Sequence, residues 1–242
     1  MNKKHKWTKR QAKNALVPNF GKKYVTQPAL LKLIGVVKNK RVLELGSGNG
    51  YWLELLSQRG ASCTGVEISK KQINLAKERN SSPKIRYIQG DITNLEKYNL
   101  KSNSYDVVFL EHALLEISSI KKLEKIFNGI YKLLKKDGIS VISDLHPFAP
   151  SAKPDNLKTS KKFNYFSSGD IISLVSKRID GKEISYKDFH WTLGDIVKPI
   201  TKSGLKIIEI IEPRPPVKIA NKYAQLAYRL KTPMSIMLKV IK

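Results

Sequence analysis

Three glycines and one acid are the residues of this sequence whose types and spacing best define a chemistry. Gly46, Gly48 and Gly50 stand between an apolar, strand-like run and a helical pattern that begins at Tyr51. Because they lack a Cβ, such glycines let the backbone turn tightly and approach a ligand at a helix N-terminus. Glu67 follows nineteen residues after Gly48, at the end of the next strand-like run. A carboxylate at that place can accept both hydroxyl hydrogens of a ribose, so the pattern predicts a site for a nucleoside-type ligand.

The spacing of the glycines discriminates between nucleotide cofactors. The dinucleotide fingerprint would have its third glycine at position 51, where this chain has Tyr51. A nicotinamide or flavin dinucleotide is therefore disfavoured. The same turn, combined with the acid at Glu67, favours S-adenosylmethionine (SAM).

The segments around this turn predict the elements that position it. From Arg41 onward, short apolar runs alternate with helical patterns, which predicts an α/β fold with a parallel sheet. The expected strands are Arg41–Leu45, Ala61–Ile68, Ile85–Gln89, Tyr105–Leu110 and Ile139–Asp144. The expected helices are Tyr51–Gln58, Lys70–Arg79 and Ile120–Lys135, the last of which should stop before Asp137-Gly138. Since parallel strands end at one edge of a sheet, the glycine turn and Glu67 should meet there.

The regular alternation stops after the fifth expected strand. Pro147, Pro150 and Pro154 lie in a polar stretch that cannot continue a buried strand, so we expect an insertion over about 146–190. Because it interrupts the fold at the ligand edge, it is the candidate element for acceptor recognition. Regularity then returns in a helix with Thr192 as its cap, an amphipathic stretch and two strand-like runs. These segments are Asp195–Lys202, Ile219–Leu230, Leu205–Ile211 and Met234–Ile241.

Taken together, these segments resemble the class I SAM-dependent methyltransferases, and more narrowly their small-molecule branch, the type 11 methyltransferases. The resemblance covers almost the whole chain and rests on residues 44–50, 105–112, 146–148, 190–193 and 212–215. It implies a Rossmann-like, seven-stranded, mostly parallel sheet with an antiparallel final strand, an N-terminal helical lid and an insertion after the fifth strand. Residues 1–40 would form a basic arm and the lid, and residues 41–242 the methyltransferase domain.

The resemblance also implies which residues contact the cofactor, S-adenosyl-L-methionine. They fall in the lid, in the glycine turn and at the ends of the second, third and fourth strands. The methionine part would lie on the glycine turn, the ribose on Glu67, the adenine near Ile68 and Asp91, and the sulfonium near Glu111. The full set is Tyr24, Glu44, Gly46, Ser47, Gly48, Gly50, Glu67, Ile68, Asp91, Ile92, Leu110 and Glu111.

Histidines are the candidates for acid–base chemistry. Methyl transfer from a sulfonium is an in-line displacement on an activated carbon, so alignment and exclusion of water supply much of the rate. A base is needed when the acceptor is a neutral alcohol, a phenol, a carbon acid or a protonated amine, and histidine suits that role near neutral pH. His190 and His146 are the predicted bases or substrate contacts, and His112 is expected to line the SAM pocket. A packed or turn-stabilising imidazole is the alternative for each, and their distant segments lack the spacing of a metal site.

The net charge of +25 is carried mostly by lysines spread along the whole chain. A lysine-rich, solvated surface is favoured, and affinity for nucleic acid or for an anionic membrane surface stays open. No apolar run approaches the roughly 20 residues of a membrane-spanning helix, and the basic N-terminus is not followed by a secretory cleavage pattern. A cytoplasmic location is therefore expected, and the oligomeric state is left open.

Three functions compete. The first is a SAM-dependent methyltransferase that acts on a small-molecule acceptor, a metabolite or a lipid-like compound. The second is an RNA-modifying methyltransferase that uses the basic surface and the arm with Trp7. Against it, the fourth strand ends in Leu110-Glu111-His112-Ala113 rather than in the Asn/Asp-Pro-Pro-aromatic motif of enzymes that methylate base nitrogens. The third is a SAM-binding protein without catalysis.

Overall fold

The computed structural model describes residues 18–80, 82–152, 157–159 and 163–242, and the predicted basic arm lies outside the described residues. Its main sheet has seven strands in the order β3-β2-β1-β4-β5-β10-β9. Their bounds are β1 Arg41–Leu45, β2 Ser62–Glu67, β3 Ile85–Gln89, β4 Tyr105–Glu111, β5 Leu134–Leu145, β9 Lys206–Ile211 and β10 Ser235–Ile241. Strand β10 runs antiparallel to β5 and β9, and the other pairings in this sheet are parallel. The predicted Rossmann-like sheet with an antiparallel final strand is thereby confirmed.

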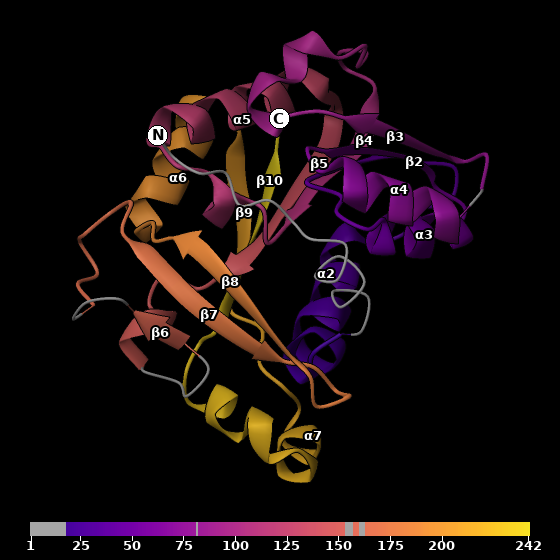
Figure 1. The fold of residues 1–242 in the computed structure, drawn as a ribbon. Helices are drawn as coiled ribbons and strands as arrows, with labels where there is room; N and C mark the ends of the chain where they lie inside the picture. The colour runs from indigo at the N-terminus through magenta and orange to yellow at the C-terminus, as the bar shows by residue number, and fades with distance from the viewer. Residues whose placement is uncertain (1–17, 81, 153–156, 160–162) are drawn as a thin grey trace.

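Helices cover both faces of this sheet (Figure 1). They are α2 Gln27–Ile34, α3 Tyr51–Gln58, α4 Lys70–Arg79, α5 Ile120–Leu133 and α6 Leu193–Lys202. The remaining α-helix, α7 Val217–Lys222, lies away from this sheet. Strand β1 shows why both faces are apolar: Val42 packs with the cluster that contains Trp52 of α3, and Leu43 packs with the cluster that contains Phe127 of α5. A strand buried on both faces reads as a continuous apolar run, which is the pattern that predicted these strands.

Local capping explains where two of the helices begin. The Ser69 hydroxyl accepts a hydrogen bond from the backbone N–H of Gln72 at the start of α4. At the start of α6, Thr192 and Asp195 form the predicted capping box, in which each side chain accepts from the backbone N–H of the other residue. These contacts satisfy N–H groups that have no partner inside the helix.

The predicted end of α5 at Lys135 lies two residues too late, and the predicted turn at Asp137-Gly138 is part of a strand. The helix ends at Leu133, and β5 begins at the fully buried Leu134, which pairs with Tyr105 of β4. A Cβ on Gly138 would lie 2.9 Å from the Tyr105 carbonyl oxygen, so the glycine allows the two strands to approach. Long-range pairing with β4 therefore extends β5 through residues that the local pattern assigned to a helix end and a turn.

The predicted insertion contains a second, three-stranded antiparallel sheet. Its strands are β6 Leu157–Thr159, β7 Ile171–Lys177 and β8 Glu183–Phe189, in that order. Figure 1 shows β7 and β8 in orange, apart from the main sheet, with α7 below them in this view. None of these strands had been predicted, because their sequence alternates weakly and carries many polar residues.

The N-terminal lid and the segment after β9 pack on each other. The segment predicted as the lid consists of a single π-helical turn, η1 (Lys22–Thr26), continued by α2. Val25 of η1 is buried with Ala220 of α7 and Leu226 of the 3-10 helix η5 (Ala224–Leu230). None of the described helices has the length and apolar content that a membrane crossing requires.

Candidate active site

The glycine turn joins the end of β1 to the start of α3 with three residues in the left-handed region. The φ angles of Gly46, Gly48 and Gly50 are +79°, +51° and +75°, which residues with a Cβ adopt at a cost. At Gly50 space is also lacking, since a Cβ would lie 2.3 Å from the Tyr87 hydroxyl. Beside Gly48 there is nothing within 4 Å of a Cβ position, so its backbone faces open space. The turn is therefore shaped for a close approach of a ligand to the backbone at Gly48.

Glu67 connects this turn to the end of β2. Its Oε2 accepts a hydrogen bond from the Gly48 N–H at 2.9 Å, and its Oε1 accepts one from the Ser69 N–H at 2.7 Å. Burial raises the pKa of this carboxyl, and the hydrogen bonds from Ser69, Gly48 and Ile68 oppose that rise. Each carboxylate oxygen still has a lone pair available for a hydroxyl donor.

Two further carboxylates, Glu44 and Glu111, lie at the same edge of the sheet. Glu111 Oε2 accepts hydrogen bonds from Lys22 Nζ of the lid at 2.8 Å and from Trp52 Nε1 at 2.7 Å. Burial raises the pKa of Glu44 well above its usual range, and the charge of Glu111 adds to that rise. Burial also raises the pKa of Glu111, but Lys22 and His112 outweigh it and hold that pKa below its usual value.

The other predicted cofactor residues differ in how far they are exposed to solvent. Asp91 caps η2 (Ile92–Lys97) by accepting from the Thr93 N–H, while Ile92 is buried and Ile68 is exposed. Leu110 is fully buried, so only its backbone can face a ligand. Ser47 is buried as well, and Tyr24 of the lid stacks on Tyr223 with their hydroxyl oxygens 3.0 Å apart.

In both predicted catalytic histidines, ring nitrogens already contact other groups of the protein. His190 is 2% exposed, its Nε2 lies 2.7 Å from the Tyr165 carbonyl oxygen, and its ring packs edge-on against Phe163. His146 Nε2 lies 2.9 Å from Glu212 Oε1, and its Nδ1 accepts a hydrogen bond from the Phe148 N–H. Burial lowers the pKa of His146 and outweighs the opposing charge of Glu212. Their catalytic roles stay predictions.

The third histidine of this edge, His112, has a different environment. It follows β4 directly and has a φ of +51°, an uncommon conformation for a residue with a Cβ. Its side chain is 45% exposed, and its Nδ1 lies 3.5 Å from Oδ1 of the buried Asp144. Partial desolvation of the ring lowers the pKa of His112, but Asp144 and Glu111 outweigh it and raise that pKa.

Asp188 of β8 interacts electrostatically with both His112 and Asp144. Burial and the negative charge of Asp144 raise the pKa of Asp188 to about 6, and His112 opposes the rise. Strand β8 thus brings an acid of the insertion to the carboxyl end of the main sheet. The sequence reasoning missed the roles of Lys22, Trp52, Asp144 and Asp188. Only Asp144 had a signal, as an acid that directly follows an expected strand.

The residues present fit a SAM-sized cofactor. Two buried carboxylate oxygens at this edge, Glu44 Oε2 and Glu111 Oε1, have no hydrogen-bond partner among the described residues. Unpaired buried acceptors call for a cation or a donor, which the ammonium of an amino-acid ligand supplies. Gly48 offers the backbone approach, and Glu67 offers acceptors for a ribose. Within the described part of the chain, no group of three or more His, Cys, Asp or Glu side chains is arranged to hold a metal ion.

The sheet order, the glycine turn and the terminal acid of β2 define the class I methyltransferase fold, whose cofactor is SAM. Residues 43–142 match the family model described as a methyltransferase domain. Over these residues the chain is thus similar to a methyltransferase domain, in agreement with the resemblance found in the sequence.

Known proteins resemble the chain at the level of this domain. It is 27% identical over 137 residues to the arsenite methyltransferase of Mus musculus, covering 52% of this chain and 35% of that protein. It is 31% identical over 110 residues to the ubiquinone biosynthesis O-methyltransferase of Pelagibacter ubique, covering 46% and 44%. The chain thus spans about a third to a half of the length of these curated relatives.

A solved structure matches the fold over more of the chain. The S-adenosylmethionine dependent methyltransferase from Mesorhizobium loti superposes with a TM-score of 0.71 and 23% identity, covering 89% of this chain and 96% of that one. At this identity the match supports the fold. It includes more than the 43–142 domain, so the surrounding elements are also shared.

Proposed function

We propose that this protein transfers a methyl group from SAM to a small-molecule acceptor. The observation that carries the proposal is the left-handed glycine turn tied to Glu67, with open space beside Gly48. Glu67 would hold the ribose, and Glu44 and Glu111 the amino-acid part. Bound SAM would supply an activated methyl group, so the chain would contribute orientation and exclusion of water.

The acceptor would lie between the carboxyl ends of β4 and β5 and strand β8. His112 is exposed enough to meet an acceptor, and the Asp144 carboxylate beside it favours the protonated imidazole that forms when His112 takes a proton. The uncommon backbone conformation of His112 supports a functional role, since such conformations persist where the surrounding structure enforces them. We therefore propose His112 as the general base, positioned by Asp144.

His190 and His146 are less available than His112 to accept a proton from a substrate. Both would have to give up existing contacts, His190 with the Tyr165 carbonyl and His146 with Glu212, before they could accept a proton from a substrate. They remain candidates for shaping the acceptor pocket. The insertion over 146–190, which supplies β8 and Asp188, is the proposed acceptor-recognition element of the 41–242 domain, and residues 18–40 of the lid would cover SAM. A cytoplasmic location stays a prediction from the sequence.

Thermal stability with S-adenosylhomocysteine tests cofactor binding. Saturating ligand should raise the melting temperature by several degrees, because a ligand that binds only the folded state stabilises it. Glu67→Gln, which keeps the size of the side chain, should remove most of that rise, whereas the matched change Glu78→Gln at an exposed position of α4 should leave it intact. No ligand-induced rise in the wild-type chain would contradict the proposal.

The role of His112 has its own test, which does not need the natural acceptor. NMR titration of the His112 ring should give a lower pKa in Asp144→Asn than in the wild type, because the neighbouring negative charge is lost.

Methyl transfer to a panel of phenols, carbon acids and amines should fall in His112→Gln more than in His190→Gln, with unchanged S-adenosylhomocysteine binding in His112→Gln. Equal turnover by wild type and His112→Gln would exclude His112 as the base.

A further inference from the structure

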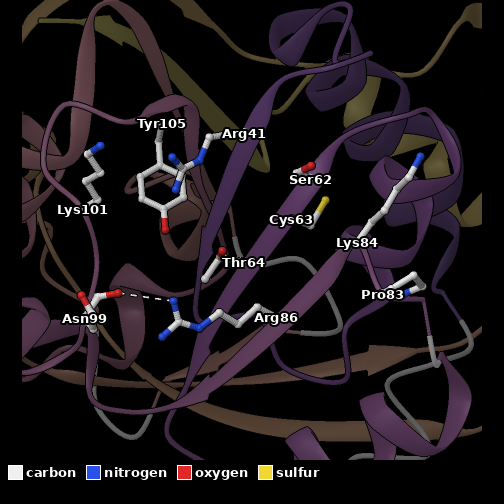
Figure 2. Close-up of a pocket in the computed structure, with 10 residues that line it drawn as sticks. All are labelled: Arg41, Ser62, Cys63, Thr64, Pro83, Lys84, Arg86, Asn99, Lys101 and Tyr105. Carbon is white, nitrogen blue, oxygen red and sulfur yellow. Dashed lines mark hydrogen bonds between the residues drawn. The ribbon is translucent and has the colours of Figure 1, made fainter.

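A pocket lies at the edge of the main sheet where the strands begin, opposite the glycine turn. It has a volume of about 420 Å³ and lies around the first residues of β1, β2 and β3 and the segment before β4 (Figure 2). Arg41 begins β1, and the glycine turn follows its end, so roughly 15 Å of extended strand separates the two sites. Nothing in the methyl-transfer proposal uses this pocket.

Four cations line this pocket, and none of its ten lining residues is acidic. The cations are Arg41 at the start of β1, Lys84 and Arg86 at the start of β3, and Lys101 before β4, so three segments of the chain supply them. Ser62, Thr64 and Asn99 add neutral polar groups. Like charges that are gathered by the fold repel each other, and an anion relieves that repulsion.

Most basic side chains of the described chain make no ion pair, and the four pocket cations are among them. Five basic side chains elsewhere each contact a carboxylate: Lys22, Arg79, Lys135, Arg178 and Lys202. Among the described residues, none of the four pocket cations makes such an ion pair. The carboxylate of Asp106, next to β1, is already occupied by Lys135 Nζ at 2.6 Å and by the Arg41 backbone N–H at 2.8 Å. The positive charge of the pocket is therefore not neutralised locally.

Two of the cations are held in place. The Arg41 guanidinium lies over the Tyr105 ring, with its central carbon 5.2 Å from the ring centroid. Arg86 Nη1 donates to the Asn99 carbonyl oxygen at 3.3 Å, and Figure 2 shows both side chains within the same pocket as Lys101. Each guanidinium keeps further N–H donors, and the planar fork of arginine matches the oxygens of a phosphate group.

We propose that this pocket binds the phosphate groups of a phosphorylated ligand. The ring of Tyr105 is 2% exposed and covered by Arg41, so it offers no free face for stacking a base. Recognition would therefore rest on phosphate rather than on base identity. The phosphates can belong to a free phosphorylated metabolite or to a nucleic-acid backbone, and the two sources share the same chemistry in this pocket.

Calorimetric titration with inorganic pyrophosphate tests the proposal on the full chain. The double variant Arg86→Gln/Lys101→Gln should weaken binding at least about tenfold, since two charges that face the anion are lost. The matched control Lys121→Gln/Lys125→Gln removes the same charge from exposed positions of α5 and should change binding by less than about twofold. Equal weakening in the two variants, or no binding of pyrophosphate to the wild type, would overturn the proposal.

A second titration separates the two phosphate sources. If a short single-stranded RNA binds the wild type and loses affinity in the pocket variant but not in the control, the pocket accepts backbone phosphates. If RNA binding is the same in all three chains while pyrophosphate binding falls in the pocket variant, the pocket selects small ligands. The pocket variant should retain the stabilisation by S-adenosylhomocysteine, so this test and that of cofactor binding can fail independently.

Discussion

The two edges of the main sheet carry opposite charges. At the carboxyl edge, Glu44, Glu67 and Glu111 are buried acids, and the lid contributes Lys22 as a cation beside them. At the amino edge, cations gather in an open pocket without a lining carboxylate. Backbone shape and burial therefore build the first site, whereas exposed charge builds the second. Changes at the first should therefore cost stability, and changes at the second should mostly alter binding.

The largest expected effect is at Gly50. In Gly50→Ala, the Cβ would meet the Tyr87 hydroxyl at 2.3 Å and the Ala76 Cβ at 2.9 Å, at a φ of +75°. We expect the free energy of unfolding to fall by about 2–4 kcal/mol, from strain and overpacking together. Denaturant unfolding measures this. Gly181→Ala is the control, because φ is +82° there with nothing within 4 Å of a Cβ, and it should lose only about 1 kcal/mol. Equal losses would show that the turn is not tightly packed.

The parts of the fold that the sequence predicted are those set by local pattern. The bounds of α3, α4, β1 and β3 follow from apolar spacing and from glycine or serine at the ends, and all four were predicted as they occur. The glycine turn was predictable for the same reason, since three glycines and one acid define it within a short stretch. Local patterns thus describe the carboxyl ends of β1 and β2 well.

What the sequence missed depends on contacts between distant segments. The helix α5 ends early because Leu134 pairs with Tyr105, and Asp188 reaches Asp144 only through the second sheet. Lys22 could not be distinguished from the other lysines before the lid was placed against Glu111. The amino-edge pocket is of the same kind, because Arg41, Lys101 and the pair Lys84 and Arg86 lie in three segments that converge only in the folded sheet.

The next effect concerns Asp188 and pH. Its folded pKa of about 6 lies above the value of 3.8 for an ordinary aspartate, so the folded state binds the proton more tightly than the unfolded state. Stability should therefore fall as pH rises from about 4 to about 6. Asp188→Asn, which cannot ionise, should be more stable than the wild type by about 1–2 kcal/mol at pH 8. Melting curves across pH measure this, and an advantage that persists unchanged at pH 3 would contradict the assignment.

The ion pair between Lys22 of the lid and Glu111 should contribute a similar amount to the free energy of unfolding, and its loss should change how much the cofactor product stabilises the protein. In Lys22→Met, Glu111 loses its cation but keeps the hydrogen bond from Trp52. Because the acid is buried, we expect a loss of about 1–2 kcal/mol in the free energy of unfolding. If the ammonium of bound S-adenosylhomocysteine reaches this acid, the ligand should stabilise Lys22→Met more than the wild type. An equal or smaller gain on ligand binding would place the ammonium elsewhere.

The smallest effect is expected at the amino edge, and it completes the contrast between the two edges. Lys84→Gln/Lys101→Gln removes two exposed cations that have no carboxylate partner among the described residues. Because repulsion between exposed charges is weak and screened, we expect a gain of no more than about 0.5 kcal/mol at low salt and none at high salt. Unfolding at two salt concentrations measures this. A loss of more than about 1 kcal/mol would mean that these lysines support the fold, and the amino edge would then resemble the carboxyl edge in being built for stability.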